Sequence, residues 1–243
     1  MSIGDSSTLL YQLIHKIDAF VAPSIFMENH YKKYFSSLHA KSTCIYNSVP
    51  SPSTPLSSKN PSTPHLFAYG RLVKEKGFDI FLQAASRLKK VFPEWHFTIA
   101  GDGVERLKLE DQCRELGLDE KAMFTGWVAP SDIYEWIDTC SLVVVPSKWQ
   151  EPFGITALQA MQRGRPVVAS NAGGLSEVVV HGKTGVVVKP DNPELLADAI
   201  EHMVTDPEKL YKFGESALHR ANSIFSWKTC VNEYENIYWQ VKL

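Results

Sequence analysis

The sequence contains few of the features that mark several large classes of protein. Its four cysteines are spread over 243 residues without a CxxC pair, which favours reduced, partly buried thiols in a cytoplasmic protein. Its 25 basic and 27 acidic side chains leave a net charge of −2, without the basic excess of a nucleic-acid-binding domain. No apolar run approaches the roughly 18 residues of a membrane span, and no signal peptide is evident. We therefore expect neither a nucleic-acid partner nor a transmembrane segment.

What remains is an ordinary globular composition, 44% hydrophobic and 21% charged, in a chain long enough to bury a full core. After residue 65, short apolar runs alternate with amphipathic stretches, which is the βα pattern of a parallel sheet. The expected strands are 66–70, 96–100, 122–125, 142–146, 167–170 and 185–188. The expected helices are 77–91, 104–116, 131–139, 154–163, 193–204, 207–224 and 227–241.

The first 65 residues have a different character. Residues 1–47 predict helix, strand, helix and strand, with a helix over 7–18 and Ser24 as the N-cap of the next helix. Residues 48–65 hold five prolines, six serines and two threonines, a composition that buries too little apolar surface to fold alone and predicts a linker. We therefore predict an α/β protein: a doubly wound parallel, Rossmann-like sheet after the linker, and a small αβ piece before it.

The loop with the strongest chemical signal follows the apolar run 142–147. It carries a carboxylate, Glu151, and then Gly154, which opens an apolar-periodic helix. The free N–H groups at a helix start favour an anion, and a glycine lets that anion approach the backbone closely. Because a carboxylate stands beside this position, the ligand indicated is a phosphate joined to a polar group such as a sugar.

Three other loops follow predicted strands at the same edge of the sheet, where open α/β sheets bind ligands. The first carries Arg71 and Lys76, which suit a phosphate but are equally consistent with a solvated charged turn. The second, Gly-Asp-Gly at 101–103, indicates close backbone approach, or a plain turn in which Asp102 caps the next helix. The third, 125–128, either contacts the edge of a base or simply ends a strand.

One more glycine-containing loop, 171–177, follows the strand over 167–170. Its two adjacent glycines permit close-packed backbone, and its Glu177 is consistent with a plain surface residue. Three aromatic side chains near the predicted site either stack on a base or sugar or pack in the core: Trp127, Trp149 and Phe153.

Taken together, the loops form five motifs in a fixed order: GRLVKEKG, IAGDG, FTGWV, PSKWQEPFGITALQAM, and VVASNAGGLSEVV followed by HGKTGVVVKP. In this order they resemble the C-terminal half of GT-B glycosyltransferases of family 4, the glycosyl transferases group 1. The upstream IDAFVAPSIFMENHYKK and STCIYNSVP resemble the end of that family's N-terminal domain, and FSWKTCVNEYENIYWQV resembles its final helix. The resemblance implies an acceptor-domain remnant over 1–47, a linker over 48–65, a nucleotide-sugar-binding domain over 66–225 and a crossover helix over 226–243.

The resemblance also implies a reaction: retaining transfer of a sugar, of the hexosyltransferase type, from a UDP- or GDP-sugar to a glycan or lipid-linked acceptor, in glycan or polysaccharide biosynthesis. No cofactor or metal is implied, and the sequence has no DxD-type pair in a suitable loop. Arg71 and Lys76 would neutralise the diphosphate leaving group, and Glu151 would contact the donor sugar. The residues that would bind the donor are Gly70, Arg71, Lys76, Gly101, Asp102, Val128, Phe153, Gly154, Ile155, Thr156 and Gln159.

The chain departs from the family pattern in two places. Gln159 stands where the family has a second glutamate that accepts hydrogen bonds from ribose; an amide still accepts and also donates, and its bond is weaker by about 1 kcal/mol. Only 47 residues precede the linker where the family has a whole domain. This predicts either a truncated N-terminal domain or a missing half that is supplied by a separate chain or a second copy. Contact with a membrane surface stays open, and neither His15 nor His30 is expected to be catalytic.

Two other functions are consistent with the same residues. In the first, the chain is a non-catalytic partner subunit with a degenerate donor site, and it docks through its first and last helices. Alternatively, it is another GT-B-like enzyme acting on a sugar nucleotide, such as an epimerase, which would release a free or epimerised sugar and no glycoside.

Overall fold

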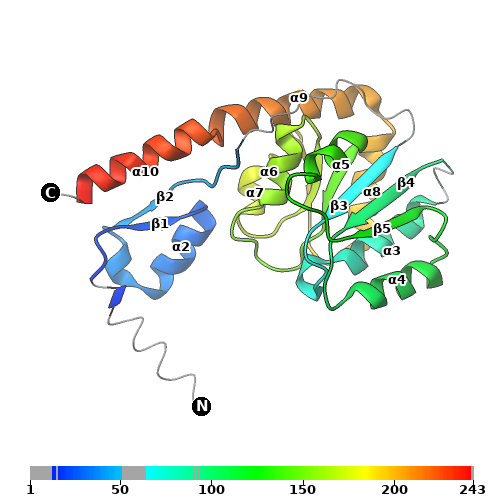
Figure 1. Ribbon diagram of the computed structural model, residues 1–243, viewed down its shortest axis with the longest axis horizontal. Coiled ribbons are helices and arrows are strands. Elements are labelled where there is room, and N and C mark those ends of the chain that lie inside the picture. Colours follow the sequence, from blue (N-terminus) through cyan, green and yellow to red (C-terminus); the bar gives the residue numbers. More distant parts are fainter. Residues whose placement is uncertain (1–12, 15, 51–63, 90, 92–93, 242–243) are drawn as a thin grey trace, which may run out of the picture.

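A computed structural model describes residues 13–14, 16–50, 64–89, 91 and 94–241. Its main feature is a parallel sheet of six strands in the order β5-β4-β3-β6-β7-β8 (Figure 1). The strands are β3 (His65–Tyr69), β4 (His96–Ala100), β5 (Ala122–Gly126), β6 (Leu142–Val145), β7 (Val167–Ser170) and β8 (Gly185–Val188). The predicted doubly wound parallel sheet is confirmed.

Helices cover both faces of this sheet (Figure 1). They are α3 (Phe78–Leu88), α4 (Arg106–Glu115), α5 (Ile133–Thr139), α6 (Ile155–Gln162), α7 (Leu175–Val178), α8 (Pro193–Val204) and α9 (Pro207–Ile224). One buried cluster joins the sheet to α3, α4 and α8, and a second joins it to α5, α6, α7 and α9. Leu66 and Ala68 point into the first cluster and Phe67 into the second, as expected for a strand buried on both faces.

The order of the strands creates a topological switch point between β3 and β6. From β3 the chain moves outward through β4 to β5, then returns to the other side of β3 with β6 and continues to β8. The loops after β3 and β6 therefore leave the sheet in opposite directions and open a crevice at its carboxyl edge, where such folds bind ligands.

A smaller unit precedes the linker. Strands β1 (Phe20–Ala22) and β2 (Ser42–Cys44) pair in parallel around α2 (Ile25–Tyr34). The predicted N-cap is confirmed, because Ser24 Oγ accepts a hydrogen bond from the Met27 N–H at 3.1 Å. Most of the helix expected over 7–18 and most of the linker lie outside the described residues.

The smaller unit is attached to the main sheet through the start of α2. Ser24 Oγ donates to the Pro152 carbonyl at 2.6 Å, and the Glu177 carboxylate accepts from the N–H groups of Ile25 and Phe26 at 2.9 and 2.7 Å. The interpretation of Glu177 as a plain surface residue is therefore wrong: its negative charge caps the positive end of α2.

The last helix, α10 (Trp227–Val241), runs from the end of α9 back along the smaller unit (Figure 1). Burial and the charges of Glu177, Glu28 and Glu233 raise the pKa of Cys44, at the end of β2, to about 12. No residue of α10 is buried. Among the described helices, none is both long enough and apolar enough to cross a bilayer.

Candidate functional site

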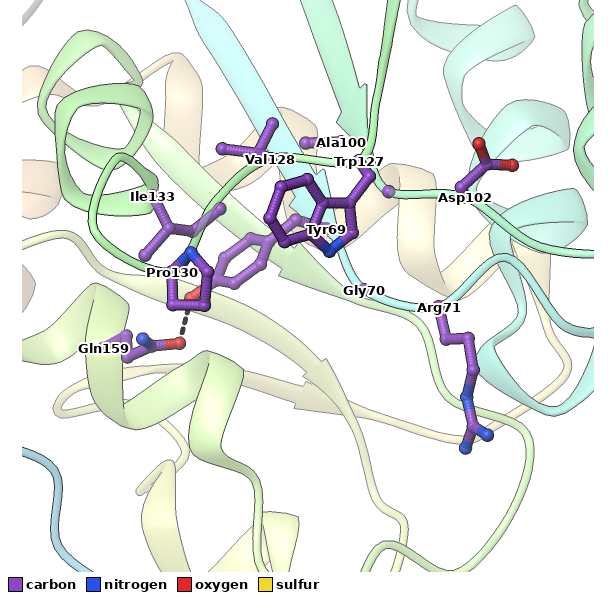
Figure 2. Close-up of a pocket in the computed structure, with 11 residues that line it drawn as sticks. Tyr69, Gly70, Arg71, Ala100, Asp102, Trp127, Val128, Pro130, Ile133 and Gln159 are labelled. Carbon is purple, nitrogen blue, oxygen red and sulfur yellow. Dashed lines mark hydrogen bonds between the residues drawn. The ribbon is translucent and has the colours of Figure 1, made fainter.

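A pocket of about 520 Å³ lies at the switch point, on the carboxyl edge of the sheet (Figure 2). Its walls come from the ends of β3, β4 and β5 and from α5 and α6. Its lining residues are Tyr69, Gly70, Arg71, Ala100, Gly101, Asp102, Trp127, Val128, Pro130, Ile133 and Gln159. Five of the predicted site residues, Gly70, Gly101, Asp102, Val128 and Gln159, are thus brought together with Arg71 in one cavity.

A second hollow of about 330 Å³ adjoins the first. It is lined by Arg71, Val73, Glu75, Lys76 and Trp149. The exposed Arg71 side chain, labelled in the larger pocket in Figure 2, lines both hollows. Within the described part of the chain, no carboxylate forms an ion pair with Arg71. A guanidinium at this shared position is therefore available to a ligand that extends from one hollow into the other.

Glu151 lies beside the second hollow as a buried carboxylate, 6% exposed. Its Oε1 accepts hydrogen bonds from Lys76 Nζ at 2.7 Å and from Ser147 Oγ at 2.5 Å. This pairing offsets the cost of burying the carboxylate. Because the ammonium group of Lys76 has three N–H donors, it keeps donors for an anion in the hollow.

The start of α6 has the geometry expected of an anion site. Gly154 is its N-cap, with φ of 123°, and no side chain caps the helix. Other residues rarely adopt this φ, and a Cβ at Gly154 would also lie 2.7 Å from Leu175 Cδ1, so the position favours glycine. The first backbone N–H groups of α6, at Ile155 and Thr156, have no partner within the helix and are available to an anion.

Two further glycines, Gly173 and Gly174, hold the loop that leads from Glu151 to α6. Gly174 N–H donates to the Glu151 carbonyl at 2.8 Å, and Gly173 forms a parallel bridge with Glu151. A Cβ on Gly173 would lie 2.5 Å from that carbonyl, and its φ is 61°. The expected close-packed backbone is confirmed here, and these contacts hold the backbone of Glu151 in place.

The carboxylate of Asp102 stays within its own turn and the following helix. Its Oδ1 accepts from the Gly103 N–H at 2.7 Å, and its Oδ2 lies 3.3 Å from Arg106. The backbone of α4 is not capped by a side chain, and its N-cap is Glu105. The alternative in which Asp102 caps the next helix is therefore wrong, although Asp102 does contact the first side chain of that helix.

The three aromatic residues have separate places. Phe153 is 2% exposed and packs against Tyr46 and Phe225, so stacking of its ring on a ligand is excluded by burial. Trp127, which is 71% exposed, stands at the mouth of the larger pocket (Figure 2), and Trp149 lines the smaller one. Together with Tyr69, these two rings are the aromatic side chains that line the two hollows.

Two residues of the site, Tyr69 and Ser147, were not among the predicted site residues. Tyr69 Oη is within hydrogen-bond distance of Gln159 Oε1 at 3.0 Å (Figure 2) and of the Thr156 carbonyl at 3.1 Å. Ser147 anchors Glu151. Both residues stand at the end of a predicted strand, and this position at the sheet edge is the signal that would have identified them.

No metal centre is found in the described ranges, because no three histidine, cysteine, aspartate or glutamate side chains gather closely enough. A doubly wound sheet with a cation at the junction of two hollows, and with an open helix start beside it, is an arrangement typical of nucleotide-binding α/β domains.

Comparison with known proteins shows which family within this class the chain belongs to. The sequence pattern of the glycosyl transferases group 1 matches residues 56–220, so the chain belongs to this glycosyltransferase family. It is 31% identical to a glycogen synthase of Mycobacterium tuberculosis over 95% of this chain and 56% of the relative. It is 32% identical to the alpha-D-kanosaminyltransferase of Streptomyces kanamyceticus over 74% of this chain and 46% of the relative. The chain thus spans about half the length of these curated relatives.

Solved structures agree with the family. The crystal structure of Anabaena HepE in complex with UDP and glucose superposes with a TM-score of 0.85 and 25% identity, over 96% of this chain and 66% of that one. The sucrose-phosphate synthase of Thermosynechococcus elongatus, 24% identical with a TM-score of 0.86, shares the fold. The predicted GT-B type of fold is confirmed.

Proposed function

We propose that this chain binds a nucleotide-diphosphate sugar across its two hollows and serves as the donor-binding part of a retaining glycosyltransferase that needs no metal. The observation that carries the proposal is the position of Arg71, an exposed cation that lines both hollows beside Lys76. A diphosphate is the group of matching charge that links a nucleoside in one hollow to a sugar in the other. Membership of the family and the UDP and glucose bound by HepE support this assignment.

The larger pocket would hold the nucleoside. Its walls are mostly apolar, with Val128 and Trp127 on one side and Gln159 on the other. In this arrangement the base lies against the backbone of Val128, and the ribose hydroxyls meet the amide of Gln159. The diphosphate then lies between Arg71 and the N–H groups of Ile155 and Thr156.

The smaller hollow would hold the sugar and the bond that breaks. When the bond from the anomeric carbon to the diphosphate oxygen opens, negative charge grows on the leaving group, and Arg71 and Lys76 stabilise it electrostatically. Glu151 is held by Lys76 and Ser147 through Oε1, and its other oxygen would accept a hydrogen bond from a sugar hydroxyl. The acceptor, a glycan or a lipid-linked sugar, would be bound by an N-terminal half in the same chain or another.

Calorimetric titration with UDP, GDP and ADP tests the proposal. We expect one of them to bind and Arg71→Ala to weaken that binding at least about tenfold, since a charged hydrogen bond to phosphate contributes about 1.5–3 kcal/mol. Arg87→Ala is the matched control, because Arg87 is an exposed arginine paired with Glu194 away from the site. Wild-type affinity in both Arg71→Ala and Lys76→Ala would refute the proposal.

One observation favours a second candidate, a partner subunit without catalysis. Helix α10 buries none of its residues, and Trp227, Tyr238 and Trp239 are 54%, 70% and 69% exposed. Such a surface is suited to docking on another polypeptide. Self-association in analytical ultracentrifugation, together with no binding of any nucleoside diphosphate, would support this function over the first.

A further inference from the structure

Lys148 belongs to the loop between β6 and α6 that also carries Glu151, and it lines neither hollow. Its ammonium group donates to Asp79 Oδ2 at 2.6 Å and lies 3.4 Å from Asp191 Oδ1. Asp79 is in the first turn of α3, and Asp191 is in the turn between β8 and α8. Because two carboxylates neutralise its charge, Lys148 is better placed to join these three segments than to bind a phosphate.

The segment that Lys148 contacts is the one that carries Lys76. The N–H group of Lys148 donates to the Glu75 carbonyl at 2.9 Å, just before Lys76. Just after Lys76, Gly77 packs against the side chain of Lys148, since a Cβ on Gly77 would lie only 3.3 Å from Lys148 Cγ. Together with the ion pair to Asp79, these contacts hold the backbone on both sides of Lys76.

The backbone around Lys76 has little support of its own. Lys74–Lys76 forms one short 3-10 helix, a type of helix with poor hydrogen-bond geometry. Gly77 follows with a φ of 70°, and among the described residues no side chain caps the start of α3. The contacts with Lys148 therefore fix the direction of the Lys76 side chain, which lines the smaller hollow with its ammonium group 2.7 Å from Glu151 Oε1.

We propose that Lys148 is a positioning residue that holds Lys76 where its ammonium group meets the second phosphate of a nucleoside diphosphate. The hold acts through the carboxylate of Asp79 and the carbonyl of Glu75. The inference rests on the proposed function, in which Arg71 and Lys76 stabilise the diphosphate. It adds to that function a residue that touches no ligand and that was not among the predicted site residues.

Calorimetric titration of the full chain tests this role by comparing UDP, GDP and ADP, each with its monophosphate. The ratio of the affinity for the diphosphate to that for the monophosphate measures how strongly the second phosphate is bound. We expect a ratio of at least about ten in wild type, the value of one charged hydrogen bond. The ratio falls toward one in Lys76→Met. It falls by a factor of at least about three in Lys148→Met, because a displaced cation keeps only part of that bond, while the monophosphate affinity changes little.

Asp79→Leu separates positioning from a simple effect of charge, and it carries the test by itself if Lys148→Met does not fold. Lys148→Met removes a positive charge and Asp79→Leu a negative one. A field effect alone would therefore lower the affinity for the second phosphate in the first variant and raise it in the second. Because both variants break the same contact, positioning lowers the ratio in both. In a Lys76→Met background neither change lowers it further, since the effect is transmitted through Lys76.

Lys32→Met is the matched control. It removes an ion pair of similar burial, to Glu28 at 2.7 Å, from a lysine side chain that is 25% exposed against 19% for Lys148, and it leaves the ratio at the wild-type value. Failure of wild type to bind any of these nucleotides would refute the proposed function and this inference with it. A wild-type ratio near one, or a ratio in folded Lys148→Met or Asp79→Leu that equals or exceeds that of wild type, would refute the inference alone. So would an equally large fall when either change is made in the Lys76→Met background.

Discussion

The two edges of the six-stranded sheet both carry polar side chains, and they use them in opposite ways. At the amino edge, where β3 begins, the polar side chain of His65 is buried and its ring nitrogens have protein partners. At the carboxyl edge, Arg71 and Gln159 line a cavity with hydrogen-bonding capacity to spare. Polar side chains near a sheet edge are therefore not evidence of a binding site by themselves. Donors and acceptors that lack a protein partner and line a cavity are such evidence.

At His65, both nitrogens of the ring have partners within the protein. Its ring nitrogens lie 3.0 Å from Thr98 Oγ1 and 3.0 Å from the Thr139 carbonyl, and its ring stacks on His96 at 4.4 Å. Nearby, Arg163 donates through Nε to Asp138 at 2.7 Å, and its side chain is 1% exposed. These groups stabilise the sheet and have few hydrogen-bond donors or acceptors left for a ligand.

The largest expected effect therefore belongs to the amino edge. Replacing Arg163 with Met leaves the carboxylate of Asp138 without its cation, and breaking such a buried pair costs about 3–5 kcal/mol. Urea denaturation measures this loss, and nucleotide affinity per folded molecule stays at the wild-type value. A loss of unfolding free energy below about 1 kcal/mol, or a large drop in nucleotide affinity, would contradict the view that Arg163 serves stability and not binding.

Next in size is Glu151→Gln at the carboxyl edge. The loss of a charge-assisted bond in a buried position costs about 1–3 kcal/mol of stability. Affinity for the nucleoside diphosphate rises, because Lys76 loses its counter-ion and interacts more strongly with phosphate. Calorimetry measures the gain, which the double variant Glu151→Gln, Lys76→Met should abolish; a gain that persists there would contradict this account.

A smaller effect is expected where the carboxyl edge meets the smaller unit. Ser24→Ala removes the N-cap of α2 and the bond to the Pro152 carbonyl, for about 1–2 kcal/mol. Hydrogen exchange should speed up both at the start of α2 and in the loop near Pro152. Asn192→Ala is the control, because it removes the N-cap of α8 and should affect only that helix; equal patterns in both variants would argue against the connection.

The smallest expected effect is a dependence on pH at the amino edge. Burial lowers the pKa of His65 below its ordinary value of 6.5, so the unfolded chain takes up a proton before the folded one. Stability is then fully present above about pH 6.5 and is lost as pH falls below it. Melting temperatures from pH 8 to 5 should decline less in His65→Gln than in wild type, whereas the exposed His219→Gln should follow the wild-type curve.

Much of the main sheet was predictable, because parallel strands buried on both faces appear as continuous apolar runs. The strands at 167–170 and 185–188 coincide with β7 and β8. Helix α7, over Leu175–Val178, was not predicted, since four residues after two glycines show no periodicity. The helix expected to reach residue 91 ends as α3 at Leu88, before its C-cap at Lys89.

The candidate site was predicted in part for the same reason. Loops that follow apolar strands meet at one edge of a parallel sheet, so Gly70 and Asp102 were expected near one another, whereas Gln159 was expected there only from the resemblance to the family. One cavity contains all three. Stacking by Phe153 was a wrong alternative, because an aromatic residue in a loop gives no sign of whether it faces the core or the ligand.

By itself, the sequence determined the strands, most of the helices, and the loops that carry glycine and charge, since these depend on local spacing and composition. Only the tertiary structure decided the strand order and the contacts between distant side chains. The pair of Lys76 with Glu151 spans 75 residues, and the bond from Gln162 to Val49 spans 113. Local periodicity carries no information about such contacts, because a hydrogen bond depends on where the folded chain brings its two partners together.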